Sequence, residues 1–327
     1  MEEPKATQCR GFITDRCDQT LCRGVTHRRG DAKDLGLVRI TNKMRVERLA
    51  VTHQPIKCIQ ICFEKIRTST HLSKYNGFDV TAPCPDPGYV LVIDQTHGDA
   101  SVTASGADRA RFLEMLVFAQ EEHPGARVII KAHPETTQGF RAGYFGPEDE
   151  NDRITLLTDP VSPWALFEGA LGVYTVSSQM GFEAILAGHR PHVFGQPFYA
   201  GWGLSEDRNP HALPRRGRVL TKAQLFLGAM IKAPTWYDAH NDCLARFETA
   251  LGSFEAEVRA WREDREGWQA AGMRLWKRGP LQQFFGRYKR VRFRNSAKDT
   301  GQAMIWAGKA QEGDRRARLE DGFLRSR

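Results

Sequence analysis

Residues 171–188 read LGVYTVSSQMGFEAILAG: a short apolar run, two serines, and then an apolar segment that ends on glycine. The run at 171–176 is typical of a buried strand, and the segment that follows is typical of a helix with serines at its cap and Gly188 at its end. A strand that passes into a helix is the repeating unit of a parallel α/β sheet. This stretch therefore predicts the α/β class.

The same alternation continues on both sides of this stretch. Further apolar runs typical of strands stand at 89–94 (YVLVID), 127–131 (RVIIK), 154–158 (ITLLT) and 191–195 (PHVFG). A helical pattern over about 107–122 places Phe112, Met115, Leu116 and Ala119 on one face. Four or five strands with helical crossovers predict one Rossmann-like half-domain.

Composition divides the chain into four segments. Residues 1–70 show no sustained period, so we expect an irregular or divergent N-terminal segment there. Residues 71–235 form the predicted Rossmann-like core. Apolar residues at helical spacing predict packing helices over 236–276. Residues 277–327 hold a basic segment and a second apolar start, AMIWAG.

The net charge of +8 is concentrated late in the chain. From Arg274 to Lys298 there are nine Lys or Arg and no Asp or Glu, with aromatic residues such as Trp276 interleaved. This pattern is typical of a surface that lies on anionic lipid headgroups or binds nucleic acid, and equally of a solvated basic face beside a domain junction. No recognisable nucleic-acid module accompanies the charge, so we expect no nucleic-acid partner.

The cysteines and the apolar segments bear on the compartment. Seven cysteines, without a CxxC pair or zinc-ligand spacing, predict free thiols in a reducing compartment. The first residues lack the pattern of a signal peptide, and no stretch approaches the roughly 18 apolar residues of a membrane span. We therefore expect a cytoplasmic protein, with the basic segment as the candidate for peripheral contact with the anionic inner membrane.

In an open α/β sheet, ligands bind beyond the carboxyl ends of the strands. The loop after the first predicted strand, DQTHGDAS (94–101), places Gln95, Asp99 and Ser101 around Gly98. It offers carboxylates, an amide and hydroxyls to a ligand. The same composition is typical of an Asx-type turn in which Asp99 or Ser101 caps the next helix, and composition alone favours that interpretation.

A second loop follows RVIIKAHP, where Lys131 and His133 stand at a strand end and Pro134 fixes the turn. A histidine held in this way donates to a phosphate oxygen. The same dipeptide recurs at His123, where a helix ends and a surface turn is expected. Position after a strand favours His133.

A third loop places Ser177 and Ser178 before a helix N-terminus. Backbone N–H groups and the helix dipole attract an anion there, and the hydroxyls add hydrogen bonds to a phosphate. Glu183, on the first turns of that helix, is a candidate partner for ribose hydroxyls. The plainer interpretation is that either serine only caps the helix.

The three loops together predict a nucleotide-phosphate pocket beside a carboxylate, without naming a reaction. The GxGxxG, Walker A and DxD-type signatures are missing from the sequence, so we expect no bound metal. No GxSxG elbow is present either, which leaves triad-type hydrolysis unsupported.

Five ordered segments between residues 72 and 207 carry a family resemblance. They are LSKYN (72–76), VLVIDQTHGDAS (90–101), VIIKAHPE (128–135), VYTVSSQMGFEAILAG (173–188) and FGQPFYAGWGLSED (194–207). Together they resemble the capsule-biosynthesis β-Kdo transferases of the KpsC type. The resemblance implies a GT-B-like fold, with a Rossmann-like nucleotide-sugar half and an incomplete partner half.

The resemblance also implies an activity. It would be transfer of Kdo from CMP-β-Kdo, with retention, to a lysophospholipid or Kdo-lipid acceptor during synthesis of the capsular polysaccharide linker. Asp99 falls on the aspartate of the family's QTxGDAS motif, whose other members here include Gln95 and Ser101. That match makes Asp99 the nucleophile of a double displacement through a covalent Kdo–enzyme adduct.

Other positions match the family's nucleotide-binding motifs. His133 and Pro134 correspond to its HP motif, expected at the CMP phosphate, with Lys131 nearby to offset donor charge. Ser177, Ser178 and Gln179 match its serine/glutamine turn and are expected to hold CMP at the helix N-terminus. CMP carries one phosphate, so these groups suffice without a divalent ion, and no cofactor is expected.

Both ends of the chain depart from the family pattern. Residues 1–70 lack the Rossmann-like portion expected there, whereas WKRGPLQQFFGRYKRVRF (276–293) and LEDGFLRSR (319–327) resemble the opening of a next module. We therefore expect a truncated or frameshifted gene product. The alternative to an active transferase is a catalytically inactive remnant that binds CMP or the membrane.

Overall fold

A computed structural model describes the chain in five stretches, namely residue 66 and residues 71–211, 213–214, 216–294 and 302–321. The prediction of an irregular segment over residues 1–70 lies outside these residues, apart from Ile66. The last part of the LEDGFLRSR segment lies outside them as well.

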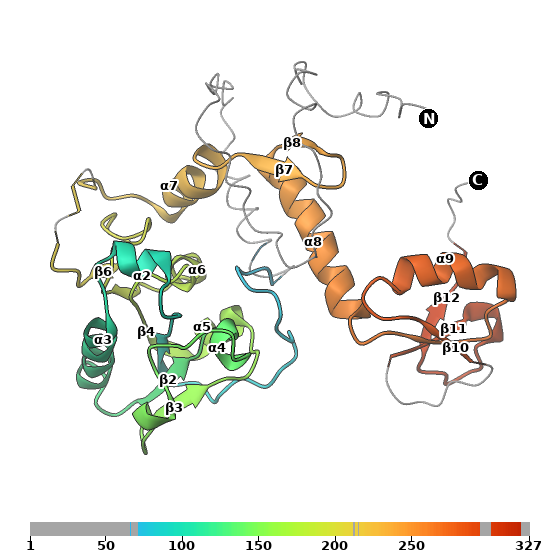
Figure 1. Cartoon of the computed structure of the whole chain (residues 1–327), viewed down its shortest axis with the longest axis horizontal. Helices are drawn as coiled ribbons and strands as arrows, with labels where there is room; N and C mark the ends of the chain where they lie inside the picture. The colour runs from blue at the N-terminus through green and yellow to red at the C-terminus, as the bar shows by residue number, and fades with distance from the viewer. Residues whose placement is uncertain (1–65, 67–70, 212, 215, 295–301, 322–327) are drawn as a thin grey trace.

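A six-stranded parallel sheet forms the larger part of the structure (Figure 1). Its strands are β1 (Tyr89–Ile93), β2 (Arg127–Lys131), β3 (Ile154–Leu157), β4 (Ala170–Thr175), β5 (His192–Val193) and β6 (Glu206–Asp207). They lie in the order β3-β2-β1-β4-β5-β6, and every neighbouring pair is parallel. The predicted α/β class is therefore confirmed.

This strand order creates a topological switch point. The chain runs outward from β1 to β2 and β3, and then returns to place β4 on the other side of β1. Loops that leave β1 and β4 consequently diverge at the carboxyl edge of the sheet, where open α/β folds bind their ligands. The two polar loops predicted from sequence, after 89–94 and after 171–176, leave these two strands.

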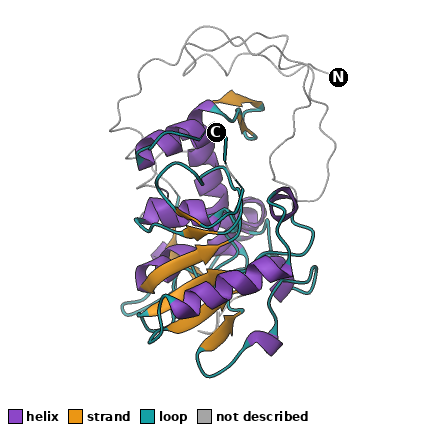
Figure 2. Cartoon of the chain, turned by 90° about the vertical axis from the view of Figure 1, so that its left-hand side faces the viewer, coloured by secondary structure: helices purple, strands orange, loops and turns teal. Residues whose placement is uncertain are grey.

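Helices cover both faces of the sheet (Figure 2). They are α2 (Ala100–Ala104), α3 (Arg109–Glu121), α4 (Pro134–Thr137), α5 (Pro163–Gly169) and α6 (Met180–Ala187), with a 3-10 turn η3 (Pro147–Asp149). Alternate side chains of β1 point to opposite faces. Val90 and Val92 pack with the core that α3 covers, and Leu91 and Ile93 pack with the core of α5 and α6.

Two helix predictions are confirmed in detail. Phe112, Met115, Leu116 and Ala119 are the buried residues of α3. The end of α6 is also as predicted, because Gly188 has a φ of 107° and its N–H group bonds to the last turn. A side chain at this position would be strained, since only glycine adopts the left-handed region without cost.

The region after the sheet begins with α7 (Lys222–Phe226) and a π-helical turn η4 (Leu227–Lys232). Two short antiparallel strands follow, β7 (Trp236–Asp238) and β8 (Cys243–Ala245), and then α8 (Phe247–Asp264). The sequence predicts packing helices over 236–276, and α8 is such a helix, but β7 and β8 form a hairpin instead. Its turn is organised by Asp238, whose carboxylate accepts from the backbone N–H of His240 at 3.0 Å.

A second, smaller parallel unit ends the described chain, at the far side of α8 from the first sheet (Figure 1). It contains β9 (Gln269–Ala271), α9 (Leu275–Phe285), β10 (Arg292–Arg294), β11 (Ala303–Trp306), η5 (Ala307–Lys309) and β12 (Ala317–Leu319). The strands lie in the order β10-β9-β11-β12, all parallel. The predicted boundary between residues 276 and 277 falls inside α9.

Within the described residues, no helix combines the length and the apolar character that crossing a bilayer requires.

Candidate active site

The loops that leave β1 and β4 are joined by Gln95 and Ser177. The Gln95 side-chain oxygen Oε1 accepts from the backbone N–H of Ser177 at 2.9 Å, and Gln95 Nε2 donates to Ser177 Oγ at 3.2 Å. Both residues are buried. The switch point of the sheet is thus bridged by side chains that are 82 residues apart in sequence.

Ser101 extends this network to Asp99. Its hydroxyl lies 3.0 Å from Ser177 Oγ and 3.3 Å from Gln95 Nε2, and it donates to Asp99 Oδ1 at 2.7 Å. The backbone N–H of Ser101 donates to the same oxygen at 2.7 Å. The sequence-predicted residues Gln95, Asp99, Ser101 and Ser177 therefore lie in one hydrogen-bonded cluster.

Asp99 is also the N-cap of α2, with extended backbone and its side chain on the first turn. The structural interpretation of this loop as a capping turn is therefore correct for Asp99. Capping does not exclude a chemical role for Asp99, because both hydrogen bonds from Ser101 end on Oδ1 and leave Oδ2 available. A capping aspartate is held in one orientation, and Asp99 remains partly exposed.

The surroundings of Asp99 favour its ionised form. Burial raises its pKa, but the hydrogen bonds from Ser101, the charge of Lys74 and the Gln95 amide more than offset this, and the pKa falls below the ordinary value. A carboxylate that is ionised at neutral pH and accepts hydrogen bonds through one oxygen is suited to act as a nucleophile or as an electrostatic partner of a cation.

His133 stands at the end of β2 as the N-cap of α4, with Pro134 at the first helical position. Its Nδ1 accepts from the backbone N–H of Glu135 at 3.2 Å, and its Nε2 lies 3.1 Å from the Tyr75 hydroxyl. Because Nδ1 accepts, the neutral ring carries its proton on Nε2. Burial lowers the pKa of His133, which favours this neutral state.

The charges around His133 link it to the Asp99 cluster. Burial has the largest effect on the pKa of His133. Among the nearby charges, Glu135 and Asp99 raise this pKa, and Lys74 lowers it. His133 Nε2–H is thus a neutral donor within the electrostatic reach of Asp99. A donor of this kind interacts with a phosphate oxygen without bringing a full charge.

Ser178 and Gln179 begin α6, but Gln179 is the N-cap and its side chain makes no capping bond. Ser178 Oγ accepts from the backbone N–H of Met180 at 3.3 Å, and the Ser178 N–H donates to Thr175 Oγ1 at 3.2 Å. The sequence predicts serines at the cap; Ser178 fills part of that role, and Ser177 turns to Gln95 instead.

Lys131 lies at the end of β2 but points away from this cluster. Its ammonium donates to the carbonyl oxygen of Asp159 at 3.0 Å and to that of Ala132 at 3.4 Å. Burial lowers its pKa to about 8, although Asp159 raises it in part. This orientation does not support the prediction that Lys131 offsets donor charge, because the amine donates a hydrogen bond to the loop after β3.

Glu183 is buried within α6 and holds the LSKYN segment. Its Oε1 accepts from Ser73 Oγ and from the backbone N–H of Lys74, both at 2.9 Å, and its Oε2 lies 3.0 Å from Ser73 Oγ. Burial raises its pKa to about 7, against the lowering effect of these bonds. Both oxygens are engaged, so the structure gives Glu183 a positioning role for residues 73–74 rather than an open face for ribose.

Sequence reasoning missed Asp94 as a site residue. Its Oδ1 accepts from the backbone N–H groups of Gln95 at 2.8 Å and Tyr144 at 3.1 Å, while Oδ2 is buried without a partner. Burial raises its pKa to about 6. A carboxylate directly after a buried strand was the available signal, but its partner loop lies 50 residues away.

Sequence reasoning also missed three residues that surround Asp99 and His133. Tyr75 forms a hydrogen bond with His133. The charge of Lys74 lowers the pKa of both Asp99 and His133. Arg141 donates to the carbonyl oxygen of His97, next to Gly98, at 2.7 Å. Lys74 and Arg141 are exposed cations at this edge of the sheet. The signal for Lys74 and Tyr75 was the LSKYN motif itself, which carried no assigned role.

The cluster can bind an anion and offer a carboxylate to it. Cations, a neutral histidine N–H and the start of α6 lie on the same edge as the Asp99 carboxylate. Among the residues that the structure describes, no group of three or more His, Cys, Asp or Glu side chains is placed to hold a metal ion.

Comparison with known proteins gives this site a family context. Residues 63–233, just over half of the 327 residues, match the family described as capsule polysaccharide biosynthesis protein. The capsule polysaccharide modification protein LipA of Neisseria meningitidis serogroup B is 32% identical over 283 residues, which cover 78% of this chain and 40% of LipA.

Two further relatives cover shorter parts. The lipopolysaccharide-processing protein LpsZ of Rhizobium meliloti is 36% identical over 190 residues, or 57% of this chain and 43% of LpsZ. The solved structure of the KpsC β-Kdo 2,4 transferase of Thermosulfurimonas dismutans is 32% identical, with a TM-score of 0.57 over 63% of each chain. The chain spans less than half the length of LipA and LpsZ. It belongs to the capsule polysaccharide biosynthesis family and is of the KpsC type.

Proposed function

We propose that this chain carries the site of a Kdo glycosyltransferase that takes Kdo from CMP-β-Kdo and transfers it with retention. Three findings support the proposal: the family membership, the 32% identity to a solved Kdo transferase, and the polar cluster at the switch point. The observation that carries it furthest is the Asp99 carboxylate, fixed by Ser101 and tied through Ser177 to the loop after β4.

The proposed reaction has two displacements. In the first, an Asp99 oxygen forms a bond to the anomeric carbon of Kdo, while the bond from that carbon to the CMP phosphate oxygen breaks and its electron pair leaves with CMP. In the second, an acceptor hydroxyl attacks the same carbon, the Asp99–Kdo ester breaks, and the hydroxyl proton is released. Two inversions give net retention. The Ser101 bonds keep Asp99 Oδ1 in place, which leaves Oδ2 as the attacking oxygen.

The nucleotide would be held on the side of the anomeric carbon opposite Asp99. The neutral His133 Nε2–H exchanges its Tyr75 partner for a phosphate oxygen, and the N–H groups at the start of α6 add their dipole. Lys74 and Arg141 balance the negative charge of the phosphate and of the Kdo carboxylate. These donors stabilise a departing monophosphate through preorganised charge.

The acceptor is proposed to be lipid-linked, a lysophospholipid or a lipid that already bears Kdo. The proposal places the reaction at the cytoplasmic side of the inner membrane. The product would be part of the linker that joins lipid to the capsule chain.

The test is the intact mass of the purified chain after incubation with freshly generated CMP-β-Kdo, for the wild type, Asp99→Asn and Asp99→Ala. Asparagine caps a helix as well as aspartate does, so Asp99→Asn keeps the fold of α2 while it removes the nucleophile. We expect the mass of one Kdo on the wild type and on neither variant.

Binding of CMP, measured by calorimetry on the same samples, separates the outcomes. An adduct on Asp99→Asn would place the nucleophile elsewhere. Binding of CMP by all three proteins without any adduct would overturn the transferase proposal in favour of the inactive remnant.

A further inference from the structure

The main chain that leads into Lys74 is fixed by two helices. Leu72 is buried, and its carbonyl oxygen accepts from Trp164 Nε1 of α5 at 2.9 Å. Ser73 donates its hydroxyl to the buried Glu183 carboxylate of α6, and the backbone N–H of Lys74 donates to the same carboxylate, both at 2.9 Å. The point from which the Lys74 side chain starts is therefore set by the folded core.

The side chain of Lys74 is exposed and its charge is open to a ligand. Its ammonium lies 5.0 Å from the centre of the Tyr75 ring, and the Tyr75 hydroxyl lies 3.1 Å from His133 Nε2. Within the described part of the chain, this ammonium makes no hydrogen bond and no ion pair. An ammonium has three N–H donors to offer, and here they face solvent beside the candidate site.

The charge of Lys74 acts on both halves of the candidate site. It lowers the pKa of Asp99 and the pKa of His133. The ammonium therefore lies near the proposed nucleophile and near the proposed phosphate donor at the same time. A donor sugar bound between these two groups would meet it.

Arg141, the other exposed cation at this edge, is already engaged within the protein. One guanidinium nitrogen donates to the carbonyl oxygen of His97 at 2.7 Å, and another lies 3.5 Å from a carboxylate oxygen of Glu135. A Cβ atom on Gly98 would approach the same guanidinium to 3.3 Å. Arg141 thus braces the turn that precedes Asp99.

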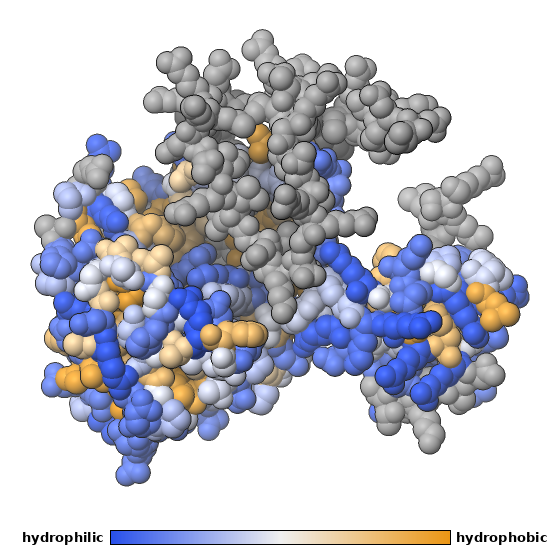
Figure 3. Space-filling model, in the orientation of Figure 1, coloured by the Kyte–Doolittle hydropathy of each residue, from blue (hydrophilic) through white to orange (hydrophobic). Residues whose placement is uncertain are grey.

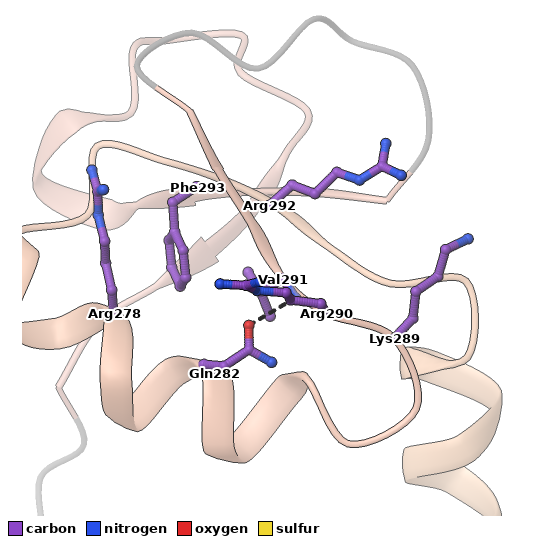
Figure 4. A pocket seen from close by; sticks show the side chains of 7 residues that line it. All are labelled: Arg278, Gln282, Lys289, Arg290, Val291, Arg292 and Phe293. Carbon is purple, nitrogen blue, oxygen red and sulfur yellow. Dashed lines mark hydrogen bonds between the residues drawn. The ribbon is translucent and has the colours of Figure 1, made fainter.

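The cations of the second parallel unit do not converge in this way. Four of them, Arg278, Lys289, Arg290 and Arg292, line a hollow of about 650 Å³. Figure 4 shows the side chains of Arg278, Lys289 and Arg292 extending apart from one another. Figure 3 shows this unit largely covered by hydrophilic side chains, with apolar ones in small separate groups. Neither the charge nor the shape there selects one ligand.

The donor proposed above carries two negative groups, the phosphate of CMP and the carboxylate of the sugar acid. In a 2-keto sugar acid this carboxylate is bonded to the anomeric carbon itself, the atom that Asp99 would attack. Two carboxylates therefore approach each other in the first displacement, and a cation beside Asp99 offsets their repulsion. The phosphate, by contrast, has His133 Nε2–H and the N–H groups at the start of α6 as its donors.

We propose that Lys74 binds the carboxylate of the donor sugar and thereby selects a sugar acid over a neutral sugar. The inference rests on the proposed transfer of Kdo, and it gives the two exposed cations separate roles. The Lys74 ammonium forms a charge-assisted hydrogen bond with the carboxylate as the bond to CMP breaks. Arg141 keeps the turn before Asp99 in place.

The test compares binding of CMP, which has no carboxylate, with binding of freshly generated CMP-β-Kdo. Both affinities are measured by thermophoresis within minutes of donor synthesis, in the Asp99→Asn background, because this variant keeps the cap of α2 and does not consume the donor. Lys74→Gln removes the charge and Lys74→Arg keeps it. Lys232→Gln, which removes one charge from an exposed residue of η4, is the matched control.

We expect Lys74→Gln to weaken binding of CMP-β-Kdo by about tenfold or more, the loss of one hydrogen bond between charged groups. Its affinity for CMP should change by no more than about threefold, as for an exposed charge without a direct contact. Lys74→Arg should keep most of the preference for CMP-β-Kdo over CMP, and Lys232→Gln all of it. Thermal unfolding of all variants should be unchanged, because Lys74 contributes its backbone N–H to the fold.

Three outcomes would overturn the inference. Equal losses of affinity for both ligands in Lys74→Gln would place the ammonium at the phosphate. Loss of the preference in Arg141→Gln, but not in Lys74→Gln, would assign the carboxylate to Arg141. Equal affinity of the parent Asp99→Asn protein for the two ligands would mean that no group binds the sugar carboxylate.

Adduct formation by the chain that retains Asp99 is scored separately from these affinities. Its absence would contradict the proposed transfer reaction, whereas the preference for CMP-β-Kdo and its dependence on Lys74 would still decide the role of this residue. Failure of the inference and failure of the proposed function are thus distinguished.

Discussion

Gln95 and Ser177 exchange two hydrogen bonds across the switch point of the sheet, with the Gln95 amide oxygen on the Ser177 N–H and the amide nitrogen on the Ser177 hydroxyl. The amide is thereby fixed in one orientation, with its N–H groups turned towards the hydroxyls of Ser177 and Ser101. The Ser101 hydroxyl in turn donates to Asp99 Oδ1 at 2.7 Å. Gln95 is thus placed to orient the proposed nucleophile through Ser101.

Gln95→Glu tests this positioning role. The carboxylate still accepts from the Ser177 N–H, but it loses the donor to the hydroxyls and adds a negative charge near Asp99. We expect adduct formation to slow by about tenfold, the equivalent of one hydrogen bond. Its pH profile should also move towards higher pH, because a like charge raises the pKa of Asp99. Gln120→Glu on α3 adds the same charge elsewhere and should leave both unchanged.

Asp99 has a structural role that can be measured apart from chemistry. Asp99→Ala removes the N-cap of α2 and should lower the free energy of unfolding by about 1 kcal/mol, whereas Asp99→Asn should leave it nearly unchanged. Urea denaturation of both variants measures this difference. Equal stability of the two variants would mean that the cap contributes nothing, and that Asp99 is held there by other contacts.

Gly143 is required by the buried Asp94 carboxylate. A Cβ atom at residue 143 would collide with Asp94 Oδ2 and approach Thr136 Cγ2 to 3.3 Å. Gly143→Ala should therefore lower the free energy of unfolding by about 1–3 kcal/mol. Gly252, inside α8, has open space around it, so Gly252→Ala should raise that free energy by about 0.5–1 kcal/mol. Thermal unfolding of both variants checks the two opposite signs.

The sequence predicted β1 and β2 well because strands buried on both faces are continuous apolar runs, and it predicted α3 well because its apolar residues recur at helical spacing. It could not predict the hairpin of β7 and β8, whose strands of three residues are too short to show a period. The family resemblance also placed Lys131 at the donor site, because this residue ends a strand just before the HP motif. Alternation along β2 instead puts its side chain on the face of Ile129, where the carbonyl oxygen of Asp159 receives it.

The candidate site was predictable residue by residue but not as a set of contacts. Gln95, Asp99, Ser101 and Ser177 were each singled out, yet nothing local shows that the first loop closes on the loop after β4. The role of Glu183 was missed for the same reason, since its partners Ser73 and Lys74 lie about 110 residues earlier. Polar networks between distant loops depend on strand order, and only the fold supplies it.

Glu183 makes stability depend on pH. Burial raises its folded-state pKa to about 7 from the ordinary 4.5, so the folded chain holds a proton that the unfolded chain has lost. The stability this provides is complete below pH 4.5 and is lost as the pH rises to about 7, by an amount on the order of 1–3 kcal/mol. Glu183→Gln should flatten this part of the stability curve, as measured by urea denaturation from pH 5 to 8. The exposed Glu168→Gln on α5 should retain the wild-type slope.

The two ring nitrogens of His133 have different roles, since Nδ1 caps α4 and Nε2–H is the proposed phosphate donor. Two variants test these roles separately. Asparagine at this position places an acceptor near the Nδ1 site and keeps the cap of α4, but it lacks the Nε2 donor. Glutamine reaches the Nε2 site with an N–H group and gives up the cap. If Nε2–H is the phosphate donor, His133→Asn should bind CMP about tenfold more weakly while its unfolding curve stays close to wild type. His133→Gln should show the reverse, with near-normal affinity for CMP and a loss of about 1 kcal/mol in stability. Calorimetric titration with CMP and urea denaturation of both variants decide the matter, and equal affinities would remove His133 from the nucleotide site.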